Sequence, residues 1–450
     1  MDDVTRANDI VLLFDNYNSD SQNLHTSFKL AGYECPAVVI EDDGFLPEDV
    51  MSVYGFFLGM AEENEKPAEK PCYFNEVKVP EYWEISGTNS NGTINDLSKV
   101  RGKIFYADPN YKRLVKTVDW YDERGVVRSS DHYNRYGIIY ARTIFNAKGQ
   151  RVNKSYFDQS GKEIIMENYV TGDIILNEEQ EIHFFKTKTD FVMYFLKSAQ
   201  FEQSRLAFNS LSTPFFVSQQ LKAALEKRDV LFWQEPIADS IPGNMQIILD
   251  GNATRTEKIY VQKRNSYDRL LALKANKEMV CRCGFIYPFV RENEHRMDVL
   301  ICTNSDRIEK INEIVKALPQ MHFHIAALTE MSSKLLELGN ELNVSLYPGA
   351  TTRELDQLFE LCDWYLDINR ESEIVSAISR AFLNNQLILA FKETLHSGDY
   401  VAEEHRYSID TLETMVADIQ RLCGDSVLFE QQLEVQRDWA LAETKEQYIF

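Results

Sequence analysis

One short pattern recurs four times in this chain at an interval of 12 residues: an aromatic residue, Asp or Asn, two further residues, and Gly. The copies are Tyr121-Asp122…Gly125, Tyr133-Asn134…Gly137, Phe145-Asn146…Gly149 and Phe157-Asp158…Gly161. Asp or Asn at the first turn position caps the local backbone, and Gly three residues later accepts the conformation that follows a type I turn. The stretches between the turns are rich in β-branched and aromatic residues, which favour strands. The repeat therefore predicts an antiparallel β-meander.

The segments around the meander alternate between apolar strands and helices. We expect a strand at Asp9–Phe14, a helix at Ser21–Leu30 and a second strand at Pro36–Ile40. Strand and turn signals follow from about Met51 to Glu181, with a charged, flexible stretch at Glu62–Lys70. The α/β pattern then resumes with Phe191–Gln200, Arg205–Leu211, Pro214–Leu225 and two buried parallel strands, Asp229–Trp233 and Gln246–Leu249. The meander is therefore predicted to be an insertion in a first α/β lobe.

The second half of the chain alternates strictly between strands and helices. The expected strands are Asp298–Cys302, Met321–Ala327, Val344–Tyr347, Trp364–Ile368 and Leu387–Phe391. The expected helices are Ile308–Leu318, Ser332–Leu338, Arg353–Leu361 and Ile374–Leu383, and Ile409–Tyr448 is expected to be mostly helical. This spacing predicts a parallel sheet that is covered on both faces.

The pattern predicts an α/β chain with two Rossmann-like lobes and an inserted antiparallel β-meander domain, which invites comparison with the two-lobed GT-B glycosyltransferases. The expected boundaries are 1–50 and 191–280 for the first lobe, 51–190 for the inserted sheet, 281–425 for the second lobe and 426–450 for a C-terminal helical segment. Ligands of such lobes bind at the carboxyl ends of the strands, so a cleft between the lobes is the expected site.

Charge and cysteine content restrict the environment and the partners. The formal net charge of −22 disfavours contact with phosphate backbones and anionic lipid headgroups, so nucleic acid is not an expected partner. Seven scattered cysteines, an odd number, indicate a reducing compartment. No stretch approaches the ~20 apolar residues of a membrane span. We expect a cytosolic protein that is attached to a membrane at most peripherally, on its cytoplasmic face.

The donor-binding motif of retaining GT-B glycosyltransferases is missing. That motif is a Glu, seven residues and a second Glu that holds the donor ribose, with glycines between them. Alignment on the strand Leu387–Phe391 puts Arg380 where the second Glu should stand, and neither Glu371 nor Glu373 has a Glu eight positions on. The segment after the first strand of this lobe offers only Arg307, beside an Asp. The sequence therefore predicts no functional donor site and no catalytic residue.

Metal and cofactor sites are not expected either. Cys281 and Cys283 have the wrong spacing for a zinc knuckle and no second pair nearby, so a structural role is favoured. His322 and His324 share one face of a predicted buried strand, where hydrogen-bonded or edge histidines are more common than a metal site. His132 lies in the meander and is interpreted as a strand surface residue. No P-loop, dinucleotide fingerprint or nucleophile elbow occurs.

Several strings, spread over nearly the whole chain, resemble one family. They are Asp42-Asp43-Gly44-Phe45-Leu46-Pro47-Glu48, Val118-Asp119-Trp120, Asp131-His132-Tyr133-Asn134-Arg135-Tyr136-Gly137, Ala141-Arg142-Thr143, Leu231-Phe232-Trp233-Gln234-Glu235, Pro242-Gly243-Asn244-Met245-Gln246-Ile247-Ile248, Thr303-Asn304-Ser305-Asp306, Phe323-His324-Ile325 and Tyr365-Leu366-Asp367-Ile368-Asn369. The chain resembles the stabilising, non-catalytic subunits (GtfB) of the bacterial accessory-Sec glycosyltransferase, which adds N-acetylglucosamine to serine-rich repeat adhesins.

The resemblance implies a pseudo-glycosyltransferase with a GT-B-like body and an inserted extended β-sheet domain. It also implies that the chain pairs with a catalytic, GtfA-like homologue and helps to hold the unfolded adhesin acceptor before accessory-Sec export. The catalytic partner uses UDP-N-acetylglucosamine, and this subunit is expected to need no cofactor. Binding a disordered acceptor must offset an ordering cost of roughly 1–2 kcal/mol per residue. Polar residues at predicted strand ends or turns are therefore the acceptor-binding candidates: Asn244, Gln246, Asn304, Ser305, Asp367, Asn369 and Arg370.

Each of these candidates could instead cap a turn or a helix.

Exposed strand edges are natural pairing surfaces, so the sheet of Tyr121–Tyr169 is expected to dock the catalytic subunit, with Tyr121, Tyr133, Phe145 and Phe157 as candidate contacts. Two other hypotheses remain open: an active glycosyltransferase with a divergent donor site, and a pure scaffold without acceptor contact.

Overall fold

The computed structural model describes residues 10–59, 70–179, 181–221 and 228–449, and the chain divides into two compact units. Unit 1 comprises residues 1–260 and 269–281, and unit 2 comprises residues 261–268 and 282–450. Most of the charged stretch Glu62–Lys70 and the end of the predicted segment Pro214–Leu225 lie outside the described residues. The two units are presented separately below.

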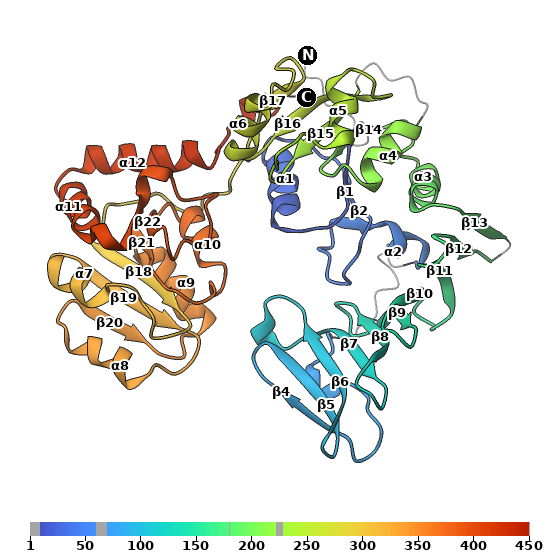
Figure 1. Cartoon of the computed structure of the whole chain (residues 1–450), viewed down its shortest axis with the longest axis horizontal. Helices are drawn as coiled ribbons and strands as arrows, with labels where there is room; N and C mark the ends of the chain where they lie inside the picture. Colours follow the sequence, from blue (N-terminus) through green and yellow to red (C-terminus); the bar gives the residue numbers. More distant parts are fainter. Residues whose placement is uncertain (1–9, 60–69, 180, 222–227, 450) are drawn as a thin grey trace. The chain divides into compact units, whose positions relative to one another are not determined.

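The first lobe is built on a seven-stranded sheet in the order β17-β16-β15-β14-β1-β2-β3 (Figure 1). Its strands are β1 (Ile10–Phe14), β2 (Ala37–Val39), β3 (Val50–Ser52), β14 (Arg205–Phe208), β15 (Asp229–Trp233), β16 (Thr256–Val261) and β17 (Val280–Arg282). The neighbouring helices are α1 (Ser19–Leu30), α2 (Val53–Phe57), α3 (Lys188–Ser198), α4 (Thr213–Gln220), α5 (Gly243–Leu249) and α6 (Arg264–Ala272). β1 pairs in parallel with both β14 and β2, as predicted for a Rossmann-like lobe.

One predicted strand of this lobe is wrong. Residues Gln246–Leu249 belong to helix α5, and the next strand is β16. A four-residue apolar run is compatible with either structure, so the flanking residues decide. Pro242 occupies the N-cap position, and Met245, Ile248 and Leu249 are buried at helical spacing. The chain therefore buries one side of a short helix there.

The inserted sheet has ten strands, which follow one another in sequence order from β4 to β13. They are β4 (Glu84–Gly87), β5 (Asn91–Asp96), β6 (Lys99–Tyr106), β7 (Val115–Tyr121), β8 (Val127–Tyr133), β9 (Ile139–Phe145), β10 (Arg151–Phe157), β11 (Glu163–Asn168), β12 (Ile174–Asn177) and β13 (Ile182–Phe185). Every neighbouring pair is antiparallel. The predicted meander is confirmed and extends beyond the repeat on both sides.

The turns of the repeat have the predicted chemistry. In the first turn, Oδ1 of Asp122 accepts hydrogen bonds from the backbone N–H groups of Arg124 (2.9 Å) and Val126 (3.0 Å). Asn134, Asn146 and Asp158 accept the equivalent bonds in the other three turns. The four glycines have φ values of +74° to +82°, a region that side chains disfavour.

Aromatic and charged side chains attach the sheet to the first lobe. Tyr54 on α2 stacks on Tyr156 of β10 with ring centroids 4.3 Å apart. Lys188 at the start of α3 forms ion pairs with Glu167 of β11 (3.0 Å) and with Glu41. Side chains alternate along β10, so the face that carries Tyr156 is turned toward the lobe and the opposite face is turned away from it.

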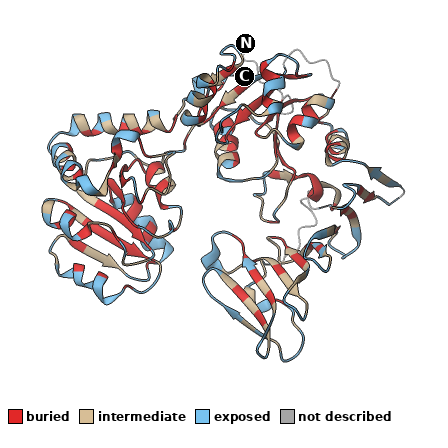
Figure 2. Cartoon of the chain, in the orientation of Figure 1, coloured by how far each residue is buried: buried red, intermediate tan, exposed pale blue. Residues whose placement is uncertain are grey.

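Unit 2 contains a six-stranded sheet in the order β20-β19-β18-β21-β22-β23. Its strands are β18 (Asp298–Thr303), β19 (His322–Ala327), β20 (Val344–Tyr347), β21 (Trp364–Asp367), β22 (Leu387–Phe391) and β23 (Arg406–Tyr407). The helices are α7 (Ile311–Ala317), α8 (Ser333–Leu336), α9 (Thr352–Leu361), α10 (Ala377–Leu383), α11 (Leu412–Cys423) and α12 (Ser426–Trp439). All strand pairs are parallel, and the central strands are buried (Figure 2).

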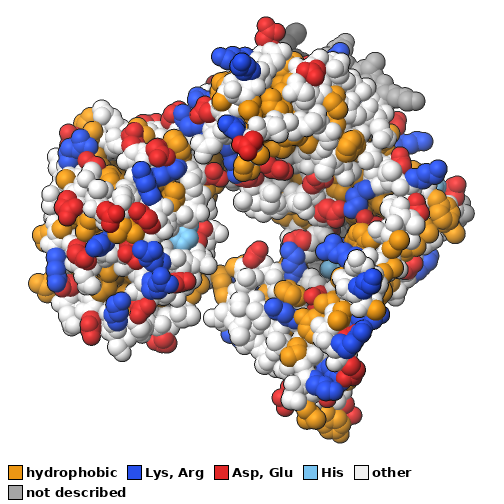
Figure 3. Space-filling view, in the orientation of Figure 1, with side chains coloured by type: hydrophobic (Ala, Val, Ile, Leu, Met, Phe, Trp, Pro, Cys, Tyr) orange, Lys and Arg blue, Asp and Glu red, His pale blue; other side chains and the backbone are white. Residues whose placement is uncertain are grey.

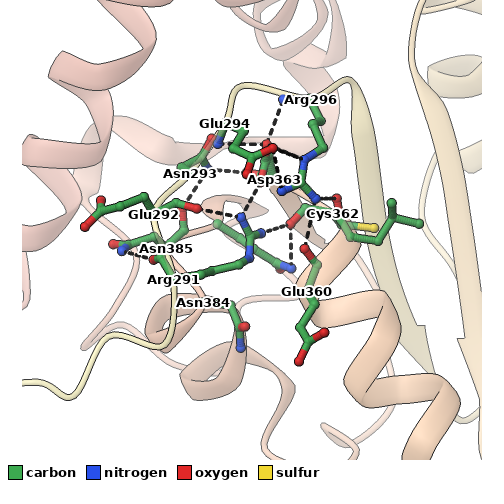
Figure 4. Close-up of polar contacts among 12 residues, drawn as sticks. Arg291, Glu292, Asn293, Glu294, Arg296, Glu360, Cys362, Asp363, Asn384 and Asn385 are labelled. Carbon is green, nitrogen blue, oxygen red and sulfur yellow. Dashed lines mark hydrogen bonds and ion pairs between the residues drawn. The ribbon is translucent and has the colours of Figure 1, made fainter.

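Asp363 organises the amino end of this sheet (Figure 4). The side chain is fully buried, and its carboxylate accepts hydrogen bonds from Arg291 Nη1 (2.6 Å) and from the backbone N–H groups of Glu294 (3.1 Å) and Arg296 (2.7 Å). Asn293 donates to the carbonyl oxygen of Asp363 (3.0 Å). The segment that leads into β18 is therefore held against the start of β21 by one carboxylate.

Candidate functional site

Each unit has a switch point, where the strand order reverses and the crossover connections leave in opposite directions. In unit 2 it lies between β18 and β21, because the chain passes from β18 to β19 and β20 before it returns to β21. In unit 1 it lies between β1 and β14, because the chain passes from β1 to β2 and β3 before it returns to β14 on the other side. Ligands of open α/β sheets bind at the carboxyl ends of such strands.

The unit 2 switch point brings together five of the seven acceptor-binding candidates. Asn304 and Ser305 follow β18, whereas Asp367, Asn369 and Arg370 lie at the end of β21 and just beyond it. A β-bridge between Ile308 and Asn369 joins the two loops. Candidates from two loops that are far apart in sequence are thus neighbours in space.

Asn369 and Asp367 are buried and hold the site together. Oδ1 of Asn369 accepts a hydrogen bond from Thr303 Oγ1 (2.9 Å), and its Nδ2 donates to the carbonyl oxygen of Glu371 (3.0 Å). Asp367 accepts from the backbone N–H of His396 (2.9 Å) and contacts the imidazole Nδ1 of the same residue (2.6 Å). Because this carboxylate stabilises the imidazolium, the pKa of His396 is raised to about 9. These contacts match the turn-capping alternative for both residues.

The other three residues are more accessible. Asn304 is exposed, and no described residue forms a hydrogen bond with its side chain. Ser305 Oγ accepts from the backbone N–H of Arg307 (3.1 Å). Arg370 is half-exposed and forms an ion pair with Glu309. The accessible polar groups at this edge are therefore an amide, a hydroxyl and a paired guanidinium.

The predicted loss of the donor motif agrees with the contacts made by the replacing residues. Arg380 forms an ion pair with Asp356 (2.6 Å), and its guanidinium carbon lies 4.1 Å from the ring centre of Phe359. Glu373 accepts a hydrogen bond from the backbone N–H of Ile378 at the start of α10 (2.8 Å). A carboxylate of the chain itself thus lies at the helix end that receives donor phosphates in retaining GT-B enzymes, where a second anion would be repelled.

The unit 1 switch point has its own polar group. Asp15 follows β1 and accepts hydrogen bonds from Ser210 Oγ (2.5 Å) and from Ser212 Oγ. Asn244 donates to the carbonyl oxygen of Leu211 between these serines (2.9 Å), so this candidate lies at the same edge. Gln246 instead contacts Asp250 on its own helix (2.8 Å).

Sequence analysis missed Asp15 and His396. Asp15 carries a usable signal, because it directly follows a buried strand. His396 carries none, because its contact with Asp367 depends on how two loops 29 residues apart are folded together.

The four aromatic residues proposed for docking do not form one surface. Successive hairpin turns lie at opposite ends of a meander, so Tyr121 and Phe145 stand at one end of the strands and Tyr133 and Phe157 at the other. Tyr133 is buried in the core of the sheet, and the other three are half-buried.

A cavity of about 350 Å³ lies where two of the quoted strings meet. The loop of Asp42 and Gly44 and the turn of Asn134 and Arg135 both line it. The backbone N–H of Arg135 donates to Gly44 (2.8 Å), and Tyr140 Oη donates to the carbonyl oxygen of Asp42 (3.0 Å). These strings therefore form part of the contact between lobe and sheet.

The histidine and cysteine pairs are structural where the chain is described. His322 contacts Ser345 (2.8 Å), and His324 lies between Tyr347 (3.0 Å) and Asp298 (2.8 Å). Cys281 and Cys283 form no disulfide. Within the described ranges, no group of three or more His, Cys, Asp and Glu side chains is arranged to hold a metal, and no helix is long and apolar enough to cross a membrane.

Two Rossmann-like units with an inserted antiparallel sheet define a GT-B-like protein. The fold resembles that of the glycosyltransferase TarM from S. aureus, with a TM-score of 0.51 at 12% identity over 97% of both chains. Family models match residues 11–57 (GtfB N-terminal domain), 83–186 (GtfB middle domain), 188–273 (GtfB third domain) and 299–436 (GftB/GlyA-F C-terminal domain).

A UDP-N-acetylglucosamine–peptide N-acetylglucosaminyltransferase stabilizing protein GtfB from Streptococcus agalactiae is 44% identical over 98% of both chains. A chain of a solved GtfA/B complex bound to UDP and GlcNAc is 39% identical, with a TM-score of 0.91 over 97% of this chain and 98% of that one. The chain belongs to the GtfB family.

Proposed function

We propose that this protein is the non-catalytic, stabilising subunit of a peptide O-GlcNAc transferase. In this proposal it docks a catalytic GtfA-like subunit and holds a serine-rich repeat adhesin for O-glycosylation before accessory-Sec export. The observation that carries the proposal is the full-length likeness to a chain of a GtfA/B complex, at 39% identity and a TM-score of 0.91. The scattered cysteines, none of which forms a disulfide in the described part of the chain, support a cytosolic location, with at most peripheral attachment to the membrane.

The donor side of unit 2 supports a non-catalytic role. Arg380 and Glu373 stand where a donor ribose and phosphates would have to bind, and both are engaged in contacts within the chain. An active glycosyltransferase with a divergent donor site is the alternative. Binding or transfer of UDP-N-acetylglucosamine by the isolated chain would establish that alternative and overturn the proposal.

The sheet of Tyr121–Tyr169 is proposed as the docking element for the catalytic subunit. A lobe pair without donor chemistry has to act through contacts. The strands of Tyr121–Tyr169 lie inside the meander, whose edges are β4 and β13, so the surface they offer is the face turned away from the first lobe. Deleting Tyr121–Tyr169 should abolish complex formation while unit 2 stays folded. Co-purification with the catalytic subunit measures the first effect, and survival of the complex would contradict the docking role.

The accessible polar groups at the unit 2 switch point are the proposed acceptor contacts. Asn304 is the sharpest test, because its exposed amide can bond to backbone and hydroxyl groups of a serine-rich chain. Asn304→Ala should weaken acceptor-peptide binding by roughly fivefold, the equivalent of one net hydrogen bond of about 1 kcal/mol. Asn369→Ala should weaken it as well, but through the loop that Asn369 supports.

A matched control separates acceptor contact from general surface effects. Asn340 is exposed, and within the described part of the chain its side chain forms one hydrogen bond, to the nearby carbonyl oxygen of Glu337 (3.0 Å). Asn340→Ala should leave affinity unchanged. If Asn304→Ala and the unaltered chain bind the acceptor peptide with equal affinity, Asn304 is not an acceptor contact. If a serine-rich peptide fails to crosslink to any part of the chain, the protein is better described as a pure scaffold. Activity assays with each subunit omitted complete the test.

A further inference from the structure

We propose that Trp120, Asp131 and Arg142 form the centre of the docking face, and that Arg142 meets a carboxylate of the catalytic subunit there. The inference rests on the proposed docking role of the sheet and identifies which of its two faces is used. Each of the three residues lies on a different neighbouring strand, β7, β8 and β9.

Strand register places the three side chains on one face. Asp131 stands opposite Val118 on β7 and opposite Arg142 on β9, and Trp120 stands opposite Ser129. Residues directly opposite each other in an antiparallel sheet point to the same side. Arg142 is in turn opposite Ser155, which alternates with Tyr156. Since Tyr156 is turned toward the first lobe, the face of Arg142 is turned away from it.

Asp131 holds the other two side chains in place. It is 4% exposed, and both of its oxygens are used: Oδ2 accepts from Trp120 Nε1 (2.8 Å) and Oδ1 from Arg142 Nε (2.5 Å). A buried carboxylate with two charge-assisted or indole hydrogen bonds orients both partners. Asp131 is therefore a positioning residue. Trp120 is half-buried against the small core of the sheet, and Arg142 is the residue that a partner would contact most fully.

The guanidinium of Arg142 is available for binding. Its side chain is 46% exposed, and Asp131 engages only Nε. Neither terminal nitrogen forms a hydrogen bond or ion pair with a described residue. Two parallel N–H groups in a fixed plane match the geometry of a carboxylate.

Beyond Arg142 the same face carries Ser155 and then a strip of three apolar side chains. Ser155, Met166, Ile175 and Phe184 succeed one another in register from β10 to β13. Phe184 is 73% exposed. A Trp and an Arg beside apolar side chains have the composition of a binding hot spot. In a hot spot, the surrounding rim excludes water from the central contact.

Charge indicates the chemistry of the partner. Residues 99–169 contain 14 Lys and Arg against 8 Asp and Glu, whereas the whole chain has 48 against 70. Lys, Arg and hydrophobic side chains are interspersed over the part of the molecule that the sheet occupies (Figure 3). An excess of positive charge in the middle strands of the sheet, on an otherwise acidic protein, fits an acidic partner surface and disfavours a second copy of this chain.

Charge reversal at Arg142 and at a second exposed Arg of the sheet provides the test. Arg142→Glu in the full chain should weaken binding of the catalytic subunit on the order of tenfold or more, because it sets a carboxylate against a carboxylate. Asp131→Asn should weaken binding less, and Arg142→Lys should restore part of it. Arg128→Glu is the control. Arg128 is exposed, lies 4.0 Å from Asp122 of the adjacent turn and is outside the register pairs that carry Trp120, Asp131 and Arg142, so this variant should bind normally.

The outcomes discriminate between the inference and its premise. If the unaltered chain does not bind the catalytic subunit, the docking role itself fails. If it binds but Arg142→Glu has no effect, or Arg128→Glu weakens binding equally, the proposed face is wrong. A steeper loss of affinity with added salt in the unaltered chain than in Arg142→Glu would support the carboxylate contact. Circular dichroism and size-exclusion chromatography of each variant exclude misfolding and self-association as causes.

Discussion

Asp367, which is buried, and His396, which is partly buried, form an ion pair that joins the loops after β21 and β22 at the proposed acceptor site. Imidazole Nδ1 lies 2.6 Å from Asp367 Oδ1, and Nε2 lies 2.5 Å from the carbonyl oxygen of Glu371. Both ring nitrogens therefore act as donors, which requires the protonated ring. The shape of the edge that carries Asn304 and Arg370 thus depends on one proton.

This pair should make the stability of unit 2 fall at alkaline pH. The pKa of His396 is about 9 in the folded chain and 6.5 as its ordinary value, so the folded state binds the proton more tightly. The extra stability is fully present below pH 6.5 and is lost as the pH rises through 9. We expect a loss of ~2 kcal/mol over that window, a reduced figure because the ring is partly solvated.

Calorimetric unfolding across the pH range measures this effect. In His396→Gln the alkaline loss should be absent, and the variant at neutral pH should resemble the unaltered protein at high pH. Parallel pH profiles for the two proteins would contradict the assignment.

Asp363 gives a second prediction, at the opposite end of the same sheet. Asp363→Asn keeps the shape of the side chain but removes the charge that compensates Arg291, whose Nη1 lies 2.6 Å away. Removing one partner of a buried pair typically costs about 3–5 kcal/mol. Denaturant unfolding of the full chain should therefore show the unit 2 transition at much lower denaturant.

The control for Asp363 is an exposed ion pair of equal length. Asp356 lies 2.6 Å from Arg380, but its side chain is 56% exposed. Solvent screens such a pair, so Asp356→Asn should cost less than about 1 kcal/mol. Equal effects of the two substitutions would mean that burial does not set the strength of the Asp363 network.

These contrasts show which parts of the fold could be predicted from sequence. The meander was predictable because the turn chemistry is local: Asp122 bonds to backbone groups two and four residues on. The strand at Gln246–Leu249 was wrong because a short apolar run does not distinguish helix from strand.

The candidate site was less predictable, because its chemistry depends on contacts between distant segments. The predicted strand ends identified Asn304 and Asn369 as candidates. They did not show that Asn369 already accepts a hydrogen bond from Thr303. The contacts among Trp120, Asp131 and Arg142 depend on strand register. The spacing of residues in the sequence does not determine that register unambiguously.

Gly44 gives a third prediction, at the contact between the first lobe and the sheet. Its φ is +84°, and a Cβ there would lie 2.5 Å from the carbonyl oxygen of Tyr133 and 2.9 Å from the ring of Tyr140. Gly44→Ala should therefore cost about 1–2 kcal/mol for the backbone conformation and a further ~1–3 kcal/mol for the clash. Gly32 is the matched control, since its φ is +91° and no atom lies within 4 Å of a Cβ.

Chemical unfolding of the two alanine variants separates the two costs. Gly32→Ala should show only the conformational cost. If both variants lose the same free energy of unfolding, the close approach of Gly44 to the sheet contributes nothing to the attachment of the sheet to the first lobe.

His132 gives a fourth prediction, with the opposite pH dependence to that of His396. Burial, with Lys154, Arg151 and Lys116 nearby, lowers the pKa of His132 to about 3, so the ring is neutral in the sheet and Nε2 contacts Thr143 Oγ1 at 2.9 Å. The unfolded chain takes up a proton near pH 6.5, which the folded sheet does not. The stability of the sheet is therefore complete above pH 6.5 and is lost as the pH falls toward 3.

Between pH 6.5 and about pH 5 the loss should reach ~2 kcal/mol, at about 1.4 kcal/mol per pH unit. Fluorescence of Trp83 and Trp120, which pack against the core of the sheet, reports its unfolding. His132→Gln can keep a hydrogen bond to Thr143 and has no proton to gain, so its profile over this range should be flatter. A His132→Gln profile as steep as that of the unaltered protein would assign the acid sensitivity to other groups, such as the buried His25, whose pKa is lowered to about 4.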